Sequence, residues 1–184
     1  MNMVARPPER EDELNVRQAR SDDQPAIESL LDAAFGKDRH QRTAYRVRQG
    51  THPIDSLSHV VEQDGEIIAS LQCWPVALFD GTNAVPLVML GPVAVKPLLQ
   101  RSGIGQMLML HVLAIADTQG APPIMLIGDP EYYGRFGFVA NWTGEWTLPG
   151  PFEQHRLLLR GGGPALAHAG EIGPRPQLSV PSPA

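Results

Sequence analysis

Apolar and polar positions alternate in blocks along the chain, and the first blocks predict a short strand followed by two helices. Residues 14–20 alternate weakly, which is typical of a strand. Residues 21–36 place apolar side chains at helical spacing after the capping residues Ser21 and Asp22, so they predict a helix. Residues 38–50 predict a second, more polar helix.

The next blocks predict antiparallel strands. Asp64 and Gly65 stand between two β-rich runs, and this dipeptide is typical of a tight hairpin turn. Residues 80–83 predict another tight turn. Residues 85–95 are almost continuously apolar, so we expect a central strand that is covered on both faces.

The second half of the chain begins with a glycine turn and a helix that is apolar nearly all round. The helix follows Gly103 and Gly105 and ends at Gly120, and about 16 residues would span about 24 Å. The remaining segments predict a buried strand at 122–129, a short helix at 130–138 that Gly137 closes, and strands within 138–142, 144–150 and 155–160.

This order of elements predicts an α+β fold with a mixed, mostly antiparallel sheet flanked by helices. Residues 1–13 are charged and contain proline, so we expect a loose N-terminal arm before a single domain over 14–160. Residues 161–184 are rich in glycine and proline, so we expect a disordered tail.

Composition and charge limit the function. A formal net charge of -5 argues against a dedicated nucleic-acid-binding protein. No apolar run approaches the ~20 residues of a membrane helix, so we expect no membrane partner. A single cysteine, Cys73, allows no intramolecular disulfide, which favours a reducing, cytoplasmic location. The histidines show no zinc-ligand spacing, so no metal is expected.

The glycine turn, "QRSGIG", has three interpretations as a nucleotide site. A Walker-type loop would need Lys and Ser or Thr after Gly105, where Gln106 and Met107 stand, and a dinucleotide fingerprint would need glycine at Leu108. The pattern Q/R-x-x-G-x-G/A is filled by Gln100, Gly103 and Gly105. Exposed N–H groups at a helix N-terminus bind pyrophosphate, and glycine lets the phosphate approach. The alternative is a plain strand-to-helix turn.

Four segments around this turn carry a resemblance to a known family. They are "LGPVAV" (90–95), "QRSGIG" (100–105), "IMLIGD" (124–129) and "YYGRFGF" (132–138). Together they resemble the GCN5-related N-acetyltransferase (GNAT) family, and within it the small bacterial predicted N-acetyltransferases. The resemblance covers about 14–159. It implies the acyl-CoA N-acyltransferase fold, in which two central strands splay apart and acetyl-CoA lies in the gap.

The resemblance also implies where the cofactor would bind. The pantetheine arm would pair like an added strand with backbone groups of Val93, Ala94 and Val95, after a bulge at Gly91-Pro92. Gln100 would complete the turn motif. The pyrophosphate would meet the amides of Arg101, Ser102, Gly103, Ile104, Gly105 and Gln106.

The family's short helix carries a tyrosine four residues before its closing Gly-Phe, and here that residue is Tyr133. We expect Tyr133 to donate a hydrogen bond to the leaving thiolate, because a phenol with pKa about 10 gives up its proton less readily than a thiol with pKa about 8.5. The alternative is a core tyrosine, with Tyr132 as the more natural packing residue. Asp129 is a candidate base near the splayed strands, but its place before Pro130 favours a helix cap.

Many family members place a glutamate on the strand before the turn, but this chain has Val88, Met89 and Leu90 there. The proton of the amine would then leave through water or through an acid from elsewhere, or the amine would already be neutral.

The resemblance therefore implies an enzyme that moves acetyl from acetyl-CoA to a primary amine by direct attack in a ternary complex. The residues available for the unidentified acceptor are Phe35, Tyr45, Trp74 and the arginines of 38–48. These arginines would suit an acidic acceptor, but the default interpretation is a solvated helix face. A non-catalytic acyl-CoA sensor and an enzyme for another acyl group remain alternatives. Exposed strands at the C-terminal end would allow a homodimer.

Overall fold

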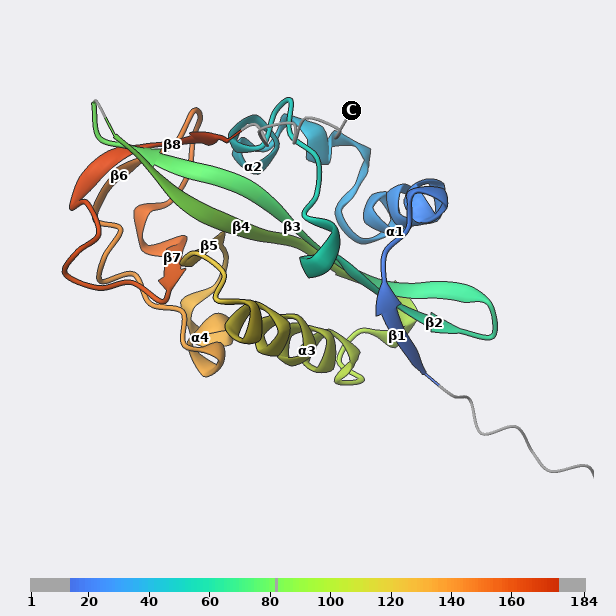
Figure 1. Cartoon of the computed structure of the whole chain (residues 1–184). Helices are drawn as coiled ribbons and strands as arrows, with labels where there is room; N and C mark the ends of the chain where they lie inside the picture. The colour runs from blue at the N-terminus through green and yellow to red at the C-terminus, as the bar shows by residue number, and fades with distance from the viewer. Residues whose placement is uncertain (1–13, 82, 176–184) are drawn as a thin grey trace, which may run out of the picture.

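The fold is built on one mixed sheet of eight strands (Figure 1). The computed structural model describes residues 14–81 and 83–175. The strands are β1 (Asn15–Gln18), β2 (His59–Gln63), β3 (Glu66–Phe79), β4 (Ala84–Val95), β5 (Ile124–Ile127), β6 (Glu145–Thr147), β7 (Leu157–Arg160) and β8 (Ala169–Pro174). Their order is β1-β2-β3-β4-β5-β7, and β8 joins β3 to β6. Only the pairs β4–β5 and β6–β8 are parallel among the described strands, which confirms the predicted fold class.

Helices cover both faces of the sheet (Figure 1). They are α1 (Gln24–Phe35), α2 (Thr43–Val47), α3 (Ile104–Gln119) and α4 (Pro130–Tyr133). Helices α1 and α2 lie over one face, and α3 and α4 lie over the other. The buried side of α3 presents Leu108, Met109 and Val112 to the sheet, and all three are fully buried. Burial of such side chains is the main source of stability for this layered arrangement.

The predicted turns and the long apolar helix are confirmed. Hairpin β2–β3 turns at Asp64 and Gly65, and β3 pairs with β4 up to Phe79 opposite Ala84. Helix α3 follows Gly103, whose φ is 88°, and ends at Gly120, whose φ is 62°. Both glycines take left-handed conformations that other residues adopt only with strain.

Strands β4 and β5 pair over a very short stretch and then part. Their register contains only two residue pairs, of which the last is Met89 with Met125. Just beyond it, β4 bulges, because Cys73 lies opposite Leu90 and Leu71 lies opposite Val93. The predicted bulge at Gly91-Pro92 is therefore present, and the two central strands splay apart past it.

Two predicted elements in the middle of the chain differ from the structure. Residues 38–50 do not form one helix, because a 3-10 turn over Lys37–Gln41 is separated from α2 at Arg42, whose backbone is extended. Residues 138–142 do not form a strand, and only an isolated bridge joins Val139 to Leu159.

The predicted disordered tail is wrong for residues 161–175. Strand β8 pairs with β3 and β6, and it buries Ile172 completely. The Trp146 indole donates a hydrogen bond to the carbonyl of Ala167 at 3.1 Å. The glycine-rich composition misled the prediction because Gly170 and Gly173 pack directly against Leu78 and Phe79. The N-terminal arm and residues 176–184 lie outside the described residues.

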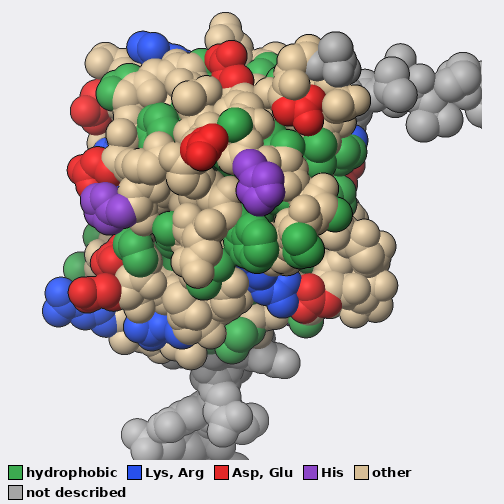
Figure 2. All heavy atoms as spheres, turned by 90° about the vertical axis from the view of Figure 1, so that its left-hand side faces the viewer, with side chains coloured by type: hydrophobic (Ala, Val, Ile, Leu, Met, Phe, Trp, Pro, Cys, Tyr) green, Lys and Arg blue, Asp and Glu red, His purple; other side chains and the backbone are tan. Residues whose placement is uncertain are grey.

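Figure 2 shows the end of the molecule where β6 and β8 lie. Acidic, basic and histidine side chains are scattered there among apolar ones. Among the described residues, none of the helices has the length and apolar character that a membrane span requires. No group of three or more His, Cys, Asp or Glu side chains in this part of the chain is placed to hold a metal ion.

Candidate active site

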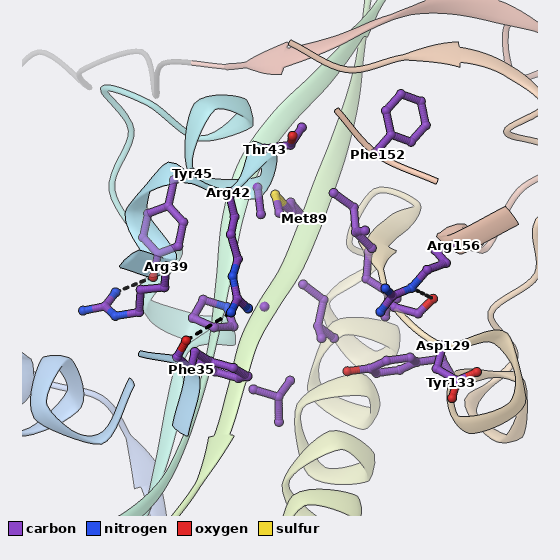
Figure 3. A pocket seen from close by; sticks show the side chains of 18 of the residues that line it. Phe35, Arg39, Arg42, Thr43, Tyr45, Met89, Asp129, Tyr133, Phe152 and Arg156 are labelled. Carbon is purple, nitrogen blue, oxygen red and sulfur yellow. Dashed lines mark hydrogen bonds between the residues drawn. The ribbon is translucent and has the colours of Figure 1, made fainter. Parts of the chain in front are cut away.

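A cavity of about 810 Å³ lies between the splayed strands (Figure 3). Its floor is formed by β4 from Met89 to Val93 and by the end of β5 and the residues after it, from Leu126 to Asp129. One wall comes from Phe35 and the α2 region, and the opposite wall comes from α4 and residues 151–156. The cavity therefore opens where β4 has lost its partner β5.

The register of β4 decides which backbone groups face the gap. Lys96 N–H donates to Ile68 of β3 at 2.8 Å, so Ala94, two residues earlier, also directs its backbone groups to β3. Val93 and Val95 alternate with them and direct theirs toward the gap. Before the bulge, Val88 N–H instead donates to Pro123 beside β5 at 3.0 Å.

Of the three strand residues predicted to pair with the cofactor, two therefore have free backbone groups on the gap side. These are Val93 and Val95. Ala94 directs its backbone groups to β3 instead, and its side chain belongs to the same buried cluster as Ile27 and Leu31 of α1. The extra residue of the bulge decides which alternate residues of β4 direct their backbone groups to the gap. The bulge therefore determines which amides and carbonyls an added strand would meet.

The glycine turn presents a row of N–H groups at the start of α3. Arg101 has a φ of 68° and Gly103 a φ of 88°, and this tight path precedes the first helical residue, Ile104. The amide of Ser102 donates to Leu99, but the structure gives no backbone acceptor within the described residues to the amides of Arg101, Gly103, Ile104, Gly105 and Gln106. A row of free donors at a helix N-terminus favours an anion.

Gly105 has a second reason to be glycine. A Cβ atom there would lie 3.3 Å from Cγ2 of Val95, so the start of α3 packs closely on β4. At Gly103 the added Cβ would meet open space, and only its backbone conformation favours glycine. The turn from Gln100 to Gln106 contributes no residue to the cavity lining and follows the C-terminal end of β4.

Tyr133 lies on α4 and directs its hydroxyl into the cavity (Figure 3). Its ring meets Tyr132 edge to face, with centroids 4.9 Å apart. Gly128 makes room for it, because a Cβ there would lie 2.6 Å from Cδ2 of Tyr133. Burial raises the pKa of Tyr133 to about 12, and Tyr132 adds to the effect. The phenol therefore stays protonated at neutral pH.

Two carboxylates line the cavity. Asp129 accepts a hydrogen bond from the amide of Glu131 at 3.0 Å, so the predicted helix cap is confirmed. Glu153 precedes β7, and its side chain is 63% exposed. Sequence reasoning missed Glu153, together with Phe152 and Arg156 of the same wall. This irregular segment carries no periodic pattern or motif that would mark it.

The aromatic residues expected near the acceptor fall into two groups. Phe35 and Tyr45 line the cavity. Trp74 does not, because it lies behind Arg48, whose guanidinium is 4.3 Å from the Trp74 ring and 4.0 Å from the Tyr45 ring. Arg48 also donates to the carbonyl of Gly91 at 2.9 Å. It thus ties α2 to the bulge of β4.

Splayed central strands beside the N-terminus of a long helix define the acyl-CoA N-acyltransferase fold. Residues 15–140 match the family model described as "Acetyltransferase (GNAT) domain", which is more than half of the chain. The chain therefore belongs to the GNAT acetyltransferase family.

Relatives with this fold are found among curated proteins and solved structures. The chain is 26% identical over 143 residues to "Uncharacterized N-acetyltransferase YhbS" of Escherichia coli strain K12, which covers 73% of this chain and 82% of that protein. A GNAT family acetyltransferase from Brucella melitensis in complex with acetyl-CoA is 26% identical, with a TM-score of 0.62 over 89% of this chain and 97% of that chain. E. coli YhbS in complex with CoA is 21% identical, with a TM-score of 0.68 over 88% and 89%, and supports the fold.

Proposed function

We propose that this protein transfers the acetyl group of acetyl-CoA to a primary amine by direct attack in a ternary complex. The observation that carries the proposal is the cavity between the splayed strands, which joins the free edge of β4 to the Tyr133 hydroxyl. Membership of the GNAT family and the acetyl-CoA complex of the B. melitensis relative support this use of the gap.

The cofactor would occupy the gap as an added strand. Its pantetheine arm would pair with Val93 and Val95, which direct free backbone groups to that side. Its pyrophosphate would bind the free amides at the start of α3, and the exposed Arg101 side chain would meet a phosphate oxygen. In this placement the thioester lies near the bulge of β4, within reach of the cavity.

The reaction would need two proton movements and one bond exchange. The amine nitrogen attacks the acetyl carbonyl carbon, a C–N bond forms, the C–S bond breaks, and the thiolate leaves. Tyr133 would donate a hydrogen bond to the sulfur. Its pKa of about 12 lies about 3.5 units above that of a thiol, so complete proton transfer would be uphill by about 5 kcal/mol.

The proton of the attacking amine would leave toward solvent. Residues 88–90 offer no acid, and Asp129 already caps α4. Glu153 is the remaining carboxylate of the cavity lining, and it stands at the exposed wall. We infer that Glu153, directly or through water, accepts this proton. Replacement by glutamine would then slow the reaction about 10-fold or more.

A second candidate function is an acyl-CoA sensor without turnover, which the lack of an acid at 88–90 favours. A third is transfer of another acyl group in the same cleft. Release of free thiol from acetyl-CoA, measured with a panel of primary amines, separates these. Amine-dependent thiol release supports the transferase. Tight CoA binding without thiol release from any amine would contradict it and support the sensor. Faster release from a succinyl or longer acyl thioester would support the third.

A further inference from the structure

Four arginines line the cavity, and one of them has its charge compensated inside the protein. Arg39 is 2% exposed, and its Nε lies 2.8 Å from Oδ1 of Asp32. It also pairs with Glu28 and donates to the hydroxyl of Tyr45. Arg39 therefore holds α1 and α2 together, and Asp32 and Glu28 neutralise its charge.

The other three arginines, Arg42, Arg48 and Arg156, have no such counter-ion. No carboxylate of residues 14–81 or 83–175 lies within 4.0 Å of their guanidinium nitrogens. Their hydrogen bonds go to neutral carbonyls: Arg42 to Phe35 at 3.0 Å, Arg48 to Gly91 at 2.9 Å and Arg156 to Gly128 at 3.5 Å. A guanidinium has five N–H donors, so most donors of each remain free for a ligand.

Arg48 is the most deeply placed of the three. It is 5% exposed and lies between the rings of Tyr45 and Trp74. Burial lowers the pKa of Arg48 to about 10, so it is still charged at neutral pH. A buried charge without a partner is costly, and two aromatic faces offset only part of that cost. An anion in the cavity would compensate the rest.

Arg42 and Arg156 come from opposite walls of the cavity; in Figure 3 the Arg156 side chain extends toward the cavity, and the Arg42 side chain runs along its wall to the carbonyl of Phe35. The Tyr133 hydroxyl points into the same cavity. The charge of Arg156 also acts on Tyr133, where it lowers the pKa against the larger effect of burial. Arg42 and Arg156 therefore line the same cavity as Tyr133, from opposite sides of it.

The phosphates of CoA do not account for these arginines. The turn proposed to bind the diphosphate, from Gln100 to Gln106, contributes no residue to the cavity lining and follows the C-terminal end of β4. The two lining carboxylates, Asp129 and Glu153, are not within ion-pair distance of the three arginines. The three cations therefore lie where the other ligand of the cavity, the acceptor, would bind.

We propose that the acceptor is a small primary amine that also carries a carboxylate or phosphate group, which Arg42, Arg48 and Arg156 bind. This inference rests on the proposed acetyltransferase function and specifies its substrate class. Guanidinium groups bind both anions through paired N–H donors. Phe35, Tyr45 and Phe152 in the same lining would contact the apolar part of the acceptor.

Matched acceptor pairs test the proposal. Phosphoethanolamine is compared with ethanolamine, and β-alanine with 3-aminopropanol, each at equal concentration of the neutral amine. Thiol release should give a kcat/KM at least about 10-fold higher for an anionic member, since charge-assisted bonds discriminate this strongly. The phosphate pair and the carboxylate pair distinguish the two anions. High salt should reduce the preference.

Arg42→Gln and Arg156→Gln change exposed side chains, so both variants should fold. Each should reduce the preference for the anionic acceptor, measured as the ratio of kcat/KM for the anionic and the neutral member of a pair, at least about 10-fold. Arg46→Gln is the matched control, because Arg46 lies on α2, is exposed and does not line the cavity. It should leave the preference unchanged.

Binding of the same anionic amines to the CoA-loaded protein, measured by calorimetry, distinguishes failure of the acceptor assignment from failure of the acetyltransferase function. Efficient acetylation of neutral amines, with no anion preference, overturns the acceptor assignment and leaves the acetyltransferase standing. Arginine-dependent binding of anionic amines without any thiol release overturns the acetyltransferase and supports the anion site. An equal loss of preference in Arg46→Gln also overturns the assignment.

Discussion

Tyr133 is the residue on which the proposed chemistry depends most. Its hydroxyl reaches the cavity because Gly128 leaves space for the ring, and burial keeps the phenol protonated. Tyr133→Phe removes only the donor and keeps the ring. We expect unchanged CoA affinity by calorimetry and a kcat reduced 10²–10⁴-fold.

Tyr132→Phe is the matched control for this substitution, because the neighbouring ring packs edge to face on Tyr133. It should lower kcat far less. If Tyr133→Phe retained full turnover with a good acceptor, Tyr133 would have no part in the reaction.

We expect His59 to make the stability of the protein depend on pH. It is buried against His111, with ring centroids 4.9 Å apart, and its Nδ1 has no hydrogen-bond partner in the described structure. Burial, and then the charge of His111, lower the pKa of His59 to about 4. The unfolded chain, with a histidine pKa near 6.5, binds a proton before the folded chain does. Protonation of His59 therefore does not lower the free energy of unfolding above about pH 6.5, and lowers it progressively as the pH drops toward 4.

The expected loss from His59 is up to about 3 kcal/mol below pH 4. Urea unfolding of the wild type and of His59→Gln at pH 7 and pH 4.5 measures it. The variant should lose less stability between the two pH values than the wild type. An identical pH dependence in both proteins would show that His59 contributes nothing to it.

The sequence predicted some residues of the candidate site and missed others. Asp129 and the glycine turn carry short-range signals, since their spacing from Pro130 and α3 is fixed by local geometry, whereas Tyr133 was indicated by the family resemblance. Glu153, Phe152 and Arg156 reach the cavity through an irregular segment, and only the tertiary fold brings them there. Ala94 directs its backbone groups to β3, whereas Val93 and Val95 direct theirs to the gap. This difference depends on how the bulge is paired with β3, which the sequence does not reveal.

Among the elements, the N-terminus of α3 carries the proposed diphosphate site, and this site can be tested by a substitution that does not damage the fold. Gly105→Glu would force its Cβ toward Val95, so it would disturb packing as well as binding. Gln106 is exposed in the first turn. Gln106→Glu should favour the helix by a few tenths of a kcal/mol to about 1 kcal/mol, because a negative charge complements the helix dipole.

The same charge should repel a diphosphate, so Gln106→Glu should weaken CoA binding at least about 10-fold while the melting temperature stays equal or rises. Calorimetry and thermal melting measure the two effects. Gln106→Ala controls for the loss of the amide and should bind CoA nearly as the wild type does. Unchanged CoA affinity in Gln106→Glu would exclude the proposed diphosphate site.

Strand β8 is the element that the sequence predicted least well, because its glycine-rich composition indicated disorder. It contributes a single large buried side chain, Ile172, in a glycine-rich segment. Ile172→Ala should lower the free energy of unfolding by 2–4 kcal/mol, because it leaves a cavity against β3. Glu171→Ala, at the neighbouring exposed position, should change it by less than about 0.5 kcal/mol. Equal, small effects in urea unfolding would contradict the packing of β8.

At the scale of the whole molecule, one long strand organises both structure and proposed function. The first half of β4 pairs with β3 and β5 in the core, and its second half, past the bulge, pairs with β3 alone. The alternation of apolar blocks predicted this strand, the helix after it and the mixed sheet, because those patterns are local. The separation of β4 from β5 is a property of the assembled sheet, and the sequence indicated it only through the family resemblance.

The most direct test is a crystal structure of the protein with acetyl-CoA or CoA bound. We expect the pantetheine arm along Val93 and Val95, the diphosphate on the amides of Arg101 to Gln106, and the sulfur within about 3.5 Å of the Tyr133 hydroxyl. A cofactor bound elsewhere, or a gap between β4 and β5 that excludes it, would contradict the account.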